Sequence, residues 1–255
     1  MKVDMILPAG GRISGQFARE AGTEVKALIR LGPWTVLERT LAAIRATGQV
    51  GRTVVIGPAE VVSHAAARAA DVALDEGGSG PANIFRGLKW LYATNGRRYP
   101  RRVLILTTDL PFLTREAITG FLRACPPGLD LCIPTLRREE FEARFPYRSG
   151  RYVRLRDGEW MIGCAVLVDP AALVRNRYVI ERAFATRRNR LAMARLLGPS
   201  FVLRYLARRL TVSHIEQRCQ DILGCTGRAI PGCAPELAFD IDYLEDYHYA
   251  VRRAA

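Results

Sequence analysis

Short apolar segments alternate with helix-like segments through the first half of the chain, and this alternation limits the folds that the sequence can adopt. The apolar segments have the length and composition of buried strands, and the segments between them have the apolar spacing of helices. This order favours an α/β fold with a mostly parallel sheet that helices cover. The expected strands are residues 3–7, 52–57, 102–107 and 131–135, and the expected helices are residues 35–47, 59–70, 84–92 and 114–125.

The pattern changes in the second half of the chain. The expected segments there are an excursion with a hairpin over residues 137–161, a returning strand over 161–168, a helical stretch over 170–223 that Gly198-Pro199 divides into two helices, a last strand within 229–242 and a terminal helix over 244–253. No internal repeat or low-complexity linker separates them. We therefore expect a single domain, residues 1–255, with a helical insertion at about residues 171–224.

A pair of glycines follows the first expected strand. Gly10 and Gly11 come directly before Arg12, and a lone lysine, Lys26, follows a loop of small residues. A strand that enters a glycine turn leaves backbone N–H groups uncovered, and these groups can approach an anion closely. Together with the charges of Arg12 and Lys26, this turn predicts a cradle for a triphosphate. The alternative is an ordinary strand-to-helix turn with solvated cations, because glycine pairs are common in turns.

Acidic residues follow two other expected strands. Asp109 follows residues 102–107 after Thr108, and Asp240 and Asp242 lie two apart on the expected last strand, where they would share one face. Open α/β sheets bind ligands beyond the carboxyl ends of their strands, so these acids should meet the glycine turn. Oxygen ligands from separate strands suit Mg²⁺, which proteins usually bind through carboxylates together with substrate phosphates. The alternatives are a turn or helix-capping role for Asp109 and a solvent-facing position for the pair.

The composition excludes several classes of protein. Hydrophobic residues make up 49% of the 255 residues, which argues against global disorder. No apolar run reaches the length of about 18 residues that a membrane span requires. The N-terminus does not resemble a signal peptide, and the six cysteines show neither CxxC nor the spacing of zinc ligands. We therefore expect reduced cysteines and a cytoplasmic protein.

The chain is strongly basic, with 38 Lys+Arg against 25 Asp+Glu and a net charge of +13. Such a charge suits nucleic acid, an anionic membrane surface or small phosphorylated substrates. Residues 171–210 contain ten arginines and one acid, Glu181, among apolar residues. This pattern is compatible with a basic amphipathic surface on anionic lipid or nucleic acid, or with helices that dock on their own domain or a second subunit. The ten arginines are at positions 175, 177, 182, 187, 188, 190, 195, 204, 208 and 209.

Four motifs occur in a fixed order: LPAGGR with KAL, EGGSGPANIFRGL, TTDLPFL and FDIDYLEDY. They resemble the successive motifs of the GT-A-fold nucleotidyltransferases, above all the NTP-transferase proteins related to the molybdenum cofactor guanylyltransferase and to the cytidylyltransferase of isoprenoid synthesis. The resemblance covers nearly the whole chain. It implies a three-layer, Rossmann-like α/β fold with a mixed, mostly parallel sheet. It also implies an enzyme of EC 2.7.7 type that transfers an NMP group from an NTP and releases pyrophosphate.

The resemblance implies roles for particular residues. By this comparison Mg²⁺ is the cofactor, and the acceptor is a phosphate or a hydroxyl group. The triphosphate would be held by Gly10, Gly11, Arg12 and Lys26, the nucleoside by Gly78, Ser79, Gly80 and Asn83, and Mg²⁺ by Asp109, Asp240 and Asp242.

The sequence also departs from the family pattern. The loop between Gly11 and Lys26 is longer than in the compact form of the family, and Val25 stands where proline is usual. The return strand carries Gly163-Cys164 in place of a Gly-Asn pair, which leaves the identity of the acceptor open. We expect a structural role for Cys164 rather than a nucleophilic one, because no histidine lies near it in the sequence and the mechanism needs none.

The expected excursion combines arginines with aromatic residues. If the excursion lies near the site, it would bind a phosphorylated acceptor through Arg151 and Arg154, with Tyr147, Tyr152 and Trp160. An equally good alternative is that the excursion is a solvated hairpin without a role in binding. Arg151, Arg154 and Cys164 are therefore the candidate acceptor contacts. The identity of the NTP does not follow from the sequence.

Three other functions fit parts of the sequence. A GT-A glycosyltransferase that uses a nucleotide sugar shares the fold and the DxD motif, but Arg12, Lys26 and the place of Asp109 favour nucleotidyl transfer. A basic module that binds lipid or nucleic acid would use residues 171–210. A dinucleotide oxidoreductase is not favoured, because the spacing from Gly10 to Gly15 departs from GxGxxG. The expected substrates are an NTP and a small phosphorylated acceptor. Residues 171–210 would contact an anionic membrane or a second copy of the chain. We do not expect nucleic acid as a partner.

Overall fold

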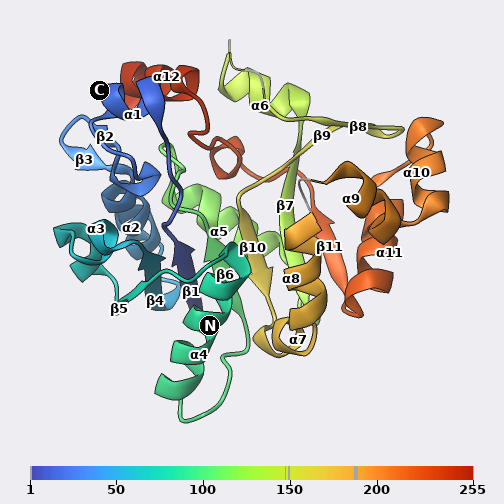
Figure 1. The fold of residues 1–255 in the computed structure, drawn as a ribbon, viewed down its shortest axis with the longest axis horizontal. Helices are drawn as coiled ribbons and strands as arrows, with labels where there is room; N and C mark the ends of the chain where they lie inside the picture. Colours follow the sequence, from blue (N-terminus) through green and yellow to red (C-terminus); the bar gives the residue numbers. More distant parts are fainter. Residues whose placement is uncertain (1, 147, 149, 187–188, 255) are drawn as a thin grey trace.

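The computed structural model describes residues 2–146, 148, 150–186 and 189–254, which contain a nine-stranded mixed sheet (Figure 1). The strand order is β5-β4-β1-β6-β10-β7-β9-β8, and β11 pairs with β7 beside this path. A separate ribbon of two short strands, β2 and β3, lies outside the sheet. The strands are β1 (Val3–Pro8), β2 (Arg30–Leu31), β3 (Trp34–Thr35), β4 (Val50–Gly57), β5 (Val72–Asp75), β6 (Val103–Leu106), β7 (Leu131–Arg137), β8 (Val153–Leu155), β9 (Gly158–Ile162), β10 (Ala165–Val168) and β11 (Gly227–Ile230).

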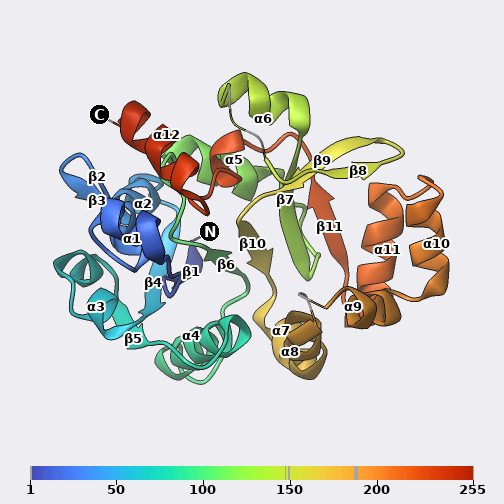
Figure 2. The same ribbon diagram turned by 45° about the horizontal axis from the view of Figure 1, so that its top comes forward.

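Helices lie on both sides of the sheet, which gives the expected three-layer α/β fold (Figure 2). Within the described part of the chain, no helix is long and apolar enough to cross a membrane. The helices are α1 (Gly15–Ala21), α2 (Val36–Ala46), α3 (Ala59–Val62), α4 (Gly80–Thr94), α5 (Arg115–Ala124), α6 (Arg138–Arg144), α7 (Pro170–Arg175), α8 (Arg177–Thr186), α9 (Arg190–Leu197), α10 (Pro199–Leu206), α11 (Val212–Leu223) and α12 (Leu244–Ala254).

Most strands run in one direction. β1 is parallel to β4 and β6, and β4 is parallel to β5. β10 is antiparallel to both β6 and β7, so β7 runs the same way as β6, and β11 is parallel to β7. β9 returns antiparallel to β7 and forms a hairpin with β8. The carboxyl ends of β1 and β6 therefore meet at one edge of the sheet, where the chain continues to Gly10 and Asp109.

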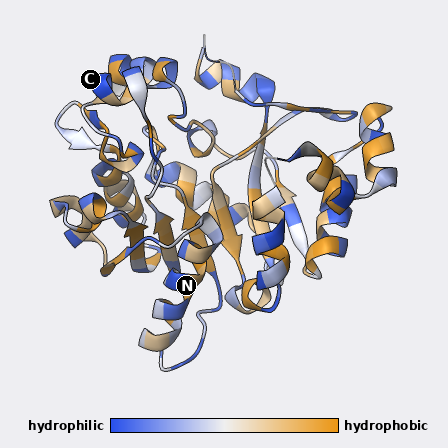
Figure 3. Cartoon of the chain, in the orientation of Figure 1, coloured by the Kyte–Doolittle hydropathy of each residue, from blue (hydrophilic) through white to orange (hydrophobic). Residues whose placement is uncertain are grey.

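Alternate residues of the strands fill two apolar cores, as the period of a strand requires. On one face, Met5 and Leu7 of β1 belong to a cluster with residues of α2 and α5. On the other face, Ile6 packs with Phe85 and Leu88 of α4. Figure 3 shows the central strands as largely hydrophobic along their length. Burial on both faces explains why these strands are continuous apolar runs in the sequence.

Capping residues fix the starts of two helices that the sequence predicts. The Thr35 hydroxyl accepts a hydrogen bond from the Glu38 N–H at 3.2 Å, and the Glu38 carboxylate accepts one from the Thr35 N–H at 2.6 Å. This capping box begins α2. The Thr114 hydroxyl accepts the Ala117 N–H at 3.1 Å and begins α5. Both helices therefore start within a residue of their predicted positions.

The prediction of one helix over residues 59–70 is wrong. Helix α3 ends at Val62, and a short 3₁₀ turn follows over Ala65–Ala69. His64 accounts for the break, because its Nδ1 atom accepts the Ala66 N–H at 3.1 Å. That side-chain bond replaces the backbone bond which a continuous helix would make.

The prediction of one return strand over residues 161–168 is also wrong, since β9 and β10 are separate strands. The Gly163 N–H donates to the Pro134 carbonyl at 2.8 Å, and the Cys164 N–H donates to the Leu237 carbonyl at 2.6 Å. An added Cβ at Gly163 would lie 2.9 Å from Pro134 Cγ and 3.0 Å from that same Leu237 oxygen. Only glycine therefore fits where the chain changes its pairing partner.

The helical stretch holds more helices than the predicted two. Among the described residues it contains the five helices α7 to α11, and arginines 187 and 188 lie outside the described residues. The predicted break at Gly198-Pro199 is confirmed, because Gly198 has a φ of 85° between α9 and α10. Asn189 and Thr211 add further helix starts by capping α9 and α11 with their side chains.

The prediction of a last strand on LAFDID, residues 237–242, is wrong, because this segment forms no strand. β11 lies earlier in the chain, over Gly227–Ile230, and a short 3₁₀ turn follows over Pro235–Leu237. Pro231 directly follows β11 and lacks the N–H that a continued strand would need. Asp240 and Asp242 therefore lie in an irregular segment before α12 and not on a strand.

Candidate active site

Gly10 and Gly11 form the turn that follows β1. The Gly10 Cα faces Glu76, so that an added Cβ would lie 2.0 Å from the Glu76 Oε2 atom. At Gly11 an added Cβ would lie 3.1 Å from Cδ of Lys26. The two glycines therefore leave the space into which neighbouring charged side chains extend.

Residues 13–25 return the chain to this turn. Most of them belong to the ordered helix α1, and Arg12 and Val25 form an antiparallel bridge that closes the loop. The Lys26 N–H then donates to the Gly11 carbonyl at 2.9 Å. Backbone bonds therefore hold Lys26 beside the glycine turn, although thirteen residues separate it from Arg12 in the sequence.

Helix α1 also rests on α12. The ring of Phe17 lies 5.8 Å from the ring of Tyr247, and the Tyr247 hydroxyl donates to the Glu20 carbonyl at 3.3 Å. The His248 Nε2 atom lies 2.6 Å from the Glu20 carboxylate. The lengthened loop thus connects the glycine turn to the helix that follows the FDID segment.

The carboxylates of Asp109, Asp240 and Asp242 come together at the carboxyl end of β6. One oxygen from each lies within 4.8 Å of the others. The Ile241 N–H donates to the Asp109 carbonyl at 3.0 Å, and this bond joins the irregular segment to the turn after β6. The three acids lie together as the sequence predicts, but Asp240 and Asp242 are not on a strand. We call these three residues the acidic triad.

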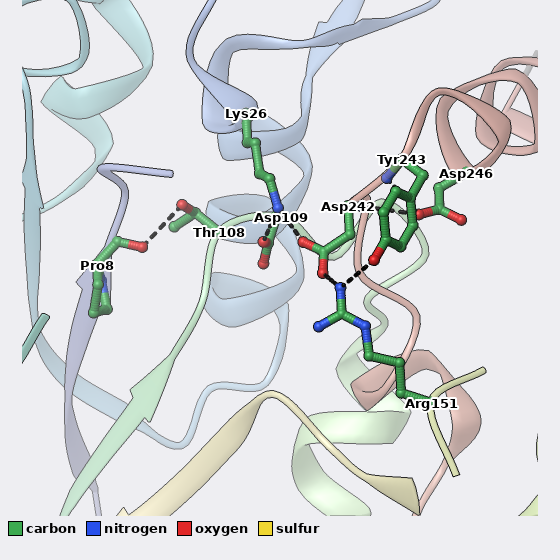
Figure 4. Close-up of polar contacts among 8 residues, drawn as sticks. All are labelled: Pro8, Lys26, Thr108, Asp109, Arg151, Asp242, Tyr243 and Asp246. Atoms are coloured by element: carbon green, nitrogen blue, oxygen red, sulfur yellow. Dashed lines mark hydrogen bonds and ion pairs between the residues drawn. The ribbon is translucent and has the colours of Figure 1, made fainter. Parts of the chain in front are cut away.

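The Lys26 ammonium lies between two members of the acidic triad (Figure 4). Its Nζ atom is 3.4 Å from Asp109 Oδ2 and forms an ion pair with Asp242. The Arg151 guanidinium forms a second ion pair with Asp242 and lies 3.4 Å from the Tyr243 hydroxyl. Asp242 therefore forms ion pairs with two cationic side chains, those of Lys26 and Arg151.

Burial and these charges shift the pKa values of the site. Burial raises the pKa of Asp240 to about 6, and the nearby carboxylates of Asp109 and Asp242 act in the same direction. Burial opposes the charge of Asp242 as well, but the hydrogen bond and charge of Lys26, together with Arg151, hold its pKa below the usual value. Burial likewise opposes the charge of Lys26, but Asp109 and Asp242 outweigh it and raise the Lys26 pKa.

The acidic triad fits a divalent cation. Carboxylate oxygens are the ligands that hard cations prefer. The Oδ1 atom of Asp109 is buried and has no hydrogen-bond partner among the described residues. Because buried polar atoms are nearly always satisfied, this oxygen is suited to a ligand that the protein itself does not supply.

A cavity of about 560 Å³, here called the glycine cavity, extends from the glycine turn to the start of α4. The Ser79 hydroxyl caps α4 by accepting the Ala82 N–H at 3.2 Å, and the Asn83 Oδ1 atom accepts the Gly77 N–H at 2.5 Å. These bonds fix the glycine-serine segment as one wall. The predicted site residues that line this cavity are Gly10, Gly11, Arg12, Lys26, Gly78, Ser79, Gly80, Asn83 and Asp109.

Arg12 lies at the glycine cavity with an exposed ion pair. Its guanidinium is 3.4 Å from Glu60, and the two side chains are 45% and 54% exposed. An exposed pair of this kind contributes little free energy. The guanidinium is therefore available to a ligand in the cavity.

A second cavity of about 350 Å³, here called the Arg151 cavity, is lined by Asp240 and Asp242. Of the predicted acceptor contacts, Arg151 and Cys164 line it. Arg154 does not: it is exposed on β8, beside Val153, which does line the cavity. Neighbouring residues of a strand point to opposite faces, which explains the difference. Tyr147 lies outside the described residues.

Cys164 has the properties of a structural residue. Burial raises the pKa of its thiol well above the usual value, and the nearby carboxylates of Asp240 and Asp109 add to this effect. A thiol of this kind stays protonated at neutral pH, whereas a nucleophilic cysteine is a thiolate.

The sequence analysis missed several residues of the site. Asp246 offers a partial signal, because an acid in the first turn of an expected helix is typical of a helix start. Glu76 offers one too, because it is the first residue of the motif EGGSGPANIFRGL. Phe184 and Arg148 carry no local signal, since tertiary packing brings them to the cavities. The missed residues are Glu76 and Phe184 at the glycine cavity, and Arg148 and Asp246 at the Arg151 cavity.

The fold is that of the nucleotidyltransferases. It is similar to a 2-C-methyl-D-erythritol 4-phosphate cytidylyltransferase from Thermus thermophilus, with a TM-score of 0.58 and 19% identity over 100% of this chain and 99% of that one. It is also similar to a nucleotidyl transferase from Methanothermobacter thermautotrophicus, with a TM-score of 0.58 and 16% identity over 99% and 97% of the two chains. At these identities the likeness concerns the fold alone.

The family follows from two closer matches. A structure described as a hypothetical transferase, also from Thermus thermophilus, is 31% identical, with a TM-score of 0.84, over 96% of this chain and 99% of that one. Residues 6–218 match the family described as MobA-like NTP transferase domain, and the chain belongs to this family. No curated protein matches the sequence. The superfamily that the four motifs resemble is thereby confirmed, and the chain is a nucleotidyltransferase in the general sense.

Proposed function

We propose that this protein is a Mg²⁺-dependent enzyme that transfers an NMP group from an NTP to a small phosphorylated acceptor and releases pyrophosphate. The position of the acidic triad carries this proposal. Asp109 lines the glycine cavity, and Asp240 and Asp242 line the Arg151 cavity. A donor in the first cavity and an acceptor in the second would therefore meet at the triad.

The reaction requires one in-line displacement. An oxygen of the acceptor phosphate attacks the α-phosphorus of the NTP and forms a new P–O bond. The bond from the α-phosphorus to the bridging oxygen breaks, and its electron pair leaves with pyrophosphate. A phosphate monoester is largely ionised at neutral pH, so its oxygen needs no general base. The enzyme then contributes positioning and charge neutralisation more than covalent chemistry.

The residues of the glycine cavity would bind the triphosphate. Uncovered N–H groups at Gly10 and Gly11 and the guanidinium of Arg12 suit its oxygens. The acidic triad would hold Mg²⁺, which when bound neutralises charge on the phosphate oxygens. Lys26, which pairs with Asp109 and Asp242 and lines the same cavity, would place its ammonium against the phosphates of the bound NTP.

The Arg151 cavity would bind the acceptor. Arg148 and Arg151 both line it, and arginine binds phosphate through two parallel N–H groups. Arg151 lines this cavity and forms an ion pair with Asp242, and its exposed guanidinium would contact the acceptor phosphate. Arg154 has no part in this proposal, since it does not line the cavity.

Binding and product analysis test the proposal. We expect at least one of ATP, GTP, CTP and UTP to raise the melting temperature in the presence of Mg²⁺, since a ligand that binds only the folded state stabilises it. Incubation with that NTP and a panel of phosphorylated small molecules should release pyrophosphate. Release of nucleoside diphosphate from a nucleotide sugar would instead support a glycosyltransferase. If no triphosphate binds with Mg²⁺, the proposal is wrong.

The arginine-rich helices support a second, peripheral proposal, contact with an anionic membrane surface. Leu191, Leu203 and Leu206 of α9 and α10 are 73%, 65% and 70% exposed, and Arg204 is exposed beside them. Exposed leucines favour contact with lipid over contact with nucleic acid. A second copy of the chain is a less suitable partner for this surface, because its arginine-rich helices carry the same positive charge. Vesicles with anionic lipid should retain the protein at low salt and release it at high salt. Equal retention by neutral vesicles, or a salt-stable dimer in light scattering, would contradict this proposal.

A further inference from the structure

Phe184 is the sole aromatic residue among the described residues that line the glycine cavity. It comes from α8, more than a hundred positions after the glycine-serine segment at residues 77–80. Helix α8 packs on α4, and the Arg177 guanidinium lies 4.8 Å from the ring centre of Phe85. The packing of α8 on α4 therefore brings one flat apolar ring to a cavity whose other described lining residues are Pro8, glycines and polar or charged residues.

The ring of Phe184 lies directly against Gly80. A Cβ added at Gly80 would lie 3.0 Å from Cζ and 3.2 Å from Cε2 of Phe184. The backbone of Gly80 is not in the left-handed region, so its conformation does not require glycine. Glycine at this first position of α4 therefore serves to leave room for the ring.

An NTP has two parts with different needs. Its triphosphate needs N–H groups and cations, which the cavity offers at Gly10, Gly11, Arg12 and Lys26. Its base is flat and largely apolar on its faces, and it gains most from an aromatic surface. Phe184 offers such a surface at the glycine-serine wall of the same cavity.

We propose that Phe184 is the surface on which the base of the NTP stacks. This inference rests on the proposed nucleotidyl transfer and adds a residue from the helical stretch to the donor site. Stacking of this kind tolerates different bases, because every base has a π-face. Phe184 therefore contributes affinity for nucleosides in general, and base identity is read elsewhere.

A purely structural role is the alternative, in which Phe184 only packs α8 against α4. The two roles differ in their effect on a ligand that lacks a base. We would measure the affinities of ATP, GTP, CTP, UTP and inorganic tripolyphosphate, each with Mg²⁺, by calorimetry. In Phe184→Leu we expect the best NTP to bind about tenfold or more weakly, and tripolyphosphate to bind within about twofold of the original affinity. Phe184→Trp, which keeps an aromatic ring at this position, should bind the NTP about as tightly as the unchanged protein does.

Two further variants sharpen the test. Tyr178→Ala changes an aromatic residue of the same helix that is 74% exposed and does not line the cavity, so it should leave both affinities unchanged. Gly80→Ala should displace the ring and weaken NTP binding, but it should have a smaller effect when combined with Phe184→Leu, because the ring is already absent.

The outcomes separate this inference from the function on which it rests. If the unchanged protein binds an NTP and tripolyphosphate equally well, stacking is refuted while the triphosphate site stands. Equal weakening of both ligands by Phe184→Leu would show a structural role and would also overturn the inference. If neither ligand binds the unchanged protein, the proposed function and the inference fail together.

Discussion

The carboxylate of Asp246 accepts the backbone N–H groups of Asp242 and Tyr243 at 2.9 and 2.8 Å (Figure 4). Asp246 is fully buried and forms an ion pair with Arg148. It lies in the first turn of α12, and from there it fixes the backbone of one member of the acidic triad. Asp246 is thus a positioning residue for Asp242.

Removal of this carboxylate should weaken both stability and metal binding. Asp246→Ala leaves Arg148 without its buried partner and two N–H groups without an acceptor, so the free energy of unfolding should fall by about 3 kcal/mol. The affinity for Mg²⁺ should fall about 10- to 100-fold, as for other residues that orient a metal ligand. Urea unfolding and a Mg²⁺ titration check this. Glu245→Ala, at the exposed neighbouring position, should change either quantity little, and an unchanged Mg²⁺ affinity in Asp246→Ala would contradict the positioning role.

Asp109 should be essential for the reaction but not for the fold. Its Oδ1 atom has no hydrogen-bond partner among the described residues, so Asp109→Asn disturbs few contacts. We expect the Mg²⁺-dependent release of pyrophosphate to fall at least about a hundredfold, because the variant loses a charged ligand for the cation. Circular dichroism should show an unchanged fold. Turnover close to the original rate in the folded variant would remove Asp109 from the proposed metal site.

The raised pKa of Asp240 predicts a stability that depends on pH. Because its pKa is about 6 in the folded state against a usual 3.8, the folded state binds the proton more tightly than the unfolded state. This carboxyl therefore lowers stability as pH rises from about 4 to 6, and the full penalty remains above pH 6. Asp240→Asn should stabilise the metal-free protein by roughly 2 kcal/mol at about pH 7.5 and by less at about pH 4.5. Urea titrations at the two pH values check this, and an equal gain at both would contradict it.

Lys26 and Arg12 should differ in their effects on the metal-free protein. Lys26 separates two carboxylates in a half-buried site, so Lys26→Met should lower the free energy of unfolding by about 2 kcal/mol, and Mg²⁺ should recover much of that loss. Arg12→Met removes only an exposed ion pair and should cost less than about 0.5 kcal/mol. Both variants should bind the NTP more weakly. Thermal unfolding with and without Mg²⁺ distinguishes them, and equal destabilisation would contradict the charge balance described for the triad.

The parts of the fold with a clear local period were predictable. The apolar runs at β1, β4, β6 and β7 are buried on both faces, so their strands are visible in the sequence. Because ligands bind at the carboxyl edge of such sheets, the sequence predicts that the glycine turn and Asp109 lie together. The structure confirms this arrangement.

Features that depend on contacts between distant segments were not predictable. The meeting of Asp240 and Asp242 with Asp109 was predicted, but no pattern in residues 237–242 indicates the hydrogen bond from Ile241 to Asp109 that holds them there. The break between β9 and β10 depends on carbonyls of Pro134 and Leu237. Local periodicity describes a segment alone, whereas these positions are set by tertiary partners.

The contact between α1 and α12 has a consequence for how the protein is made. Helix α1 is part of the loop that returns Lys26 to the glycine turn, and α12 directly follows the segment with Asp240 and Asp242. During translation the ribosome releases the turn long before α12. The strands β5, β4, β1 and β6 are therefore synthesised before the acidic triad is complete. We expect newly made protein to gain the proposed nucleotidyl-transfer activity only after α12 has left the exit tunnel.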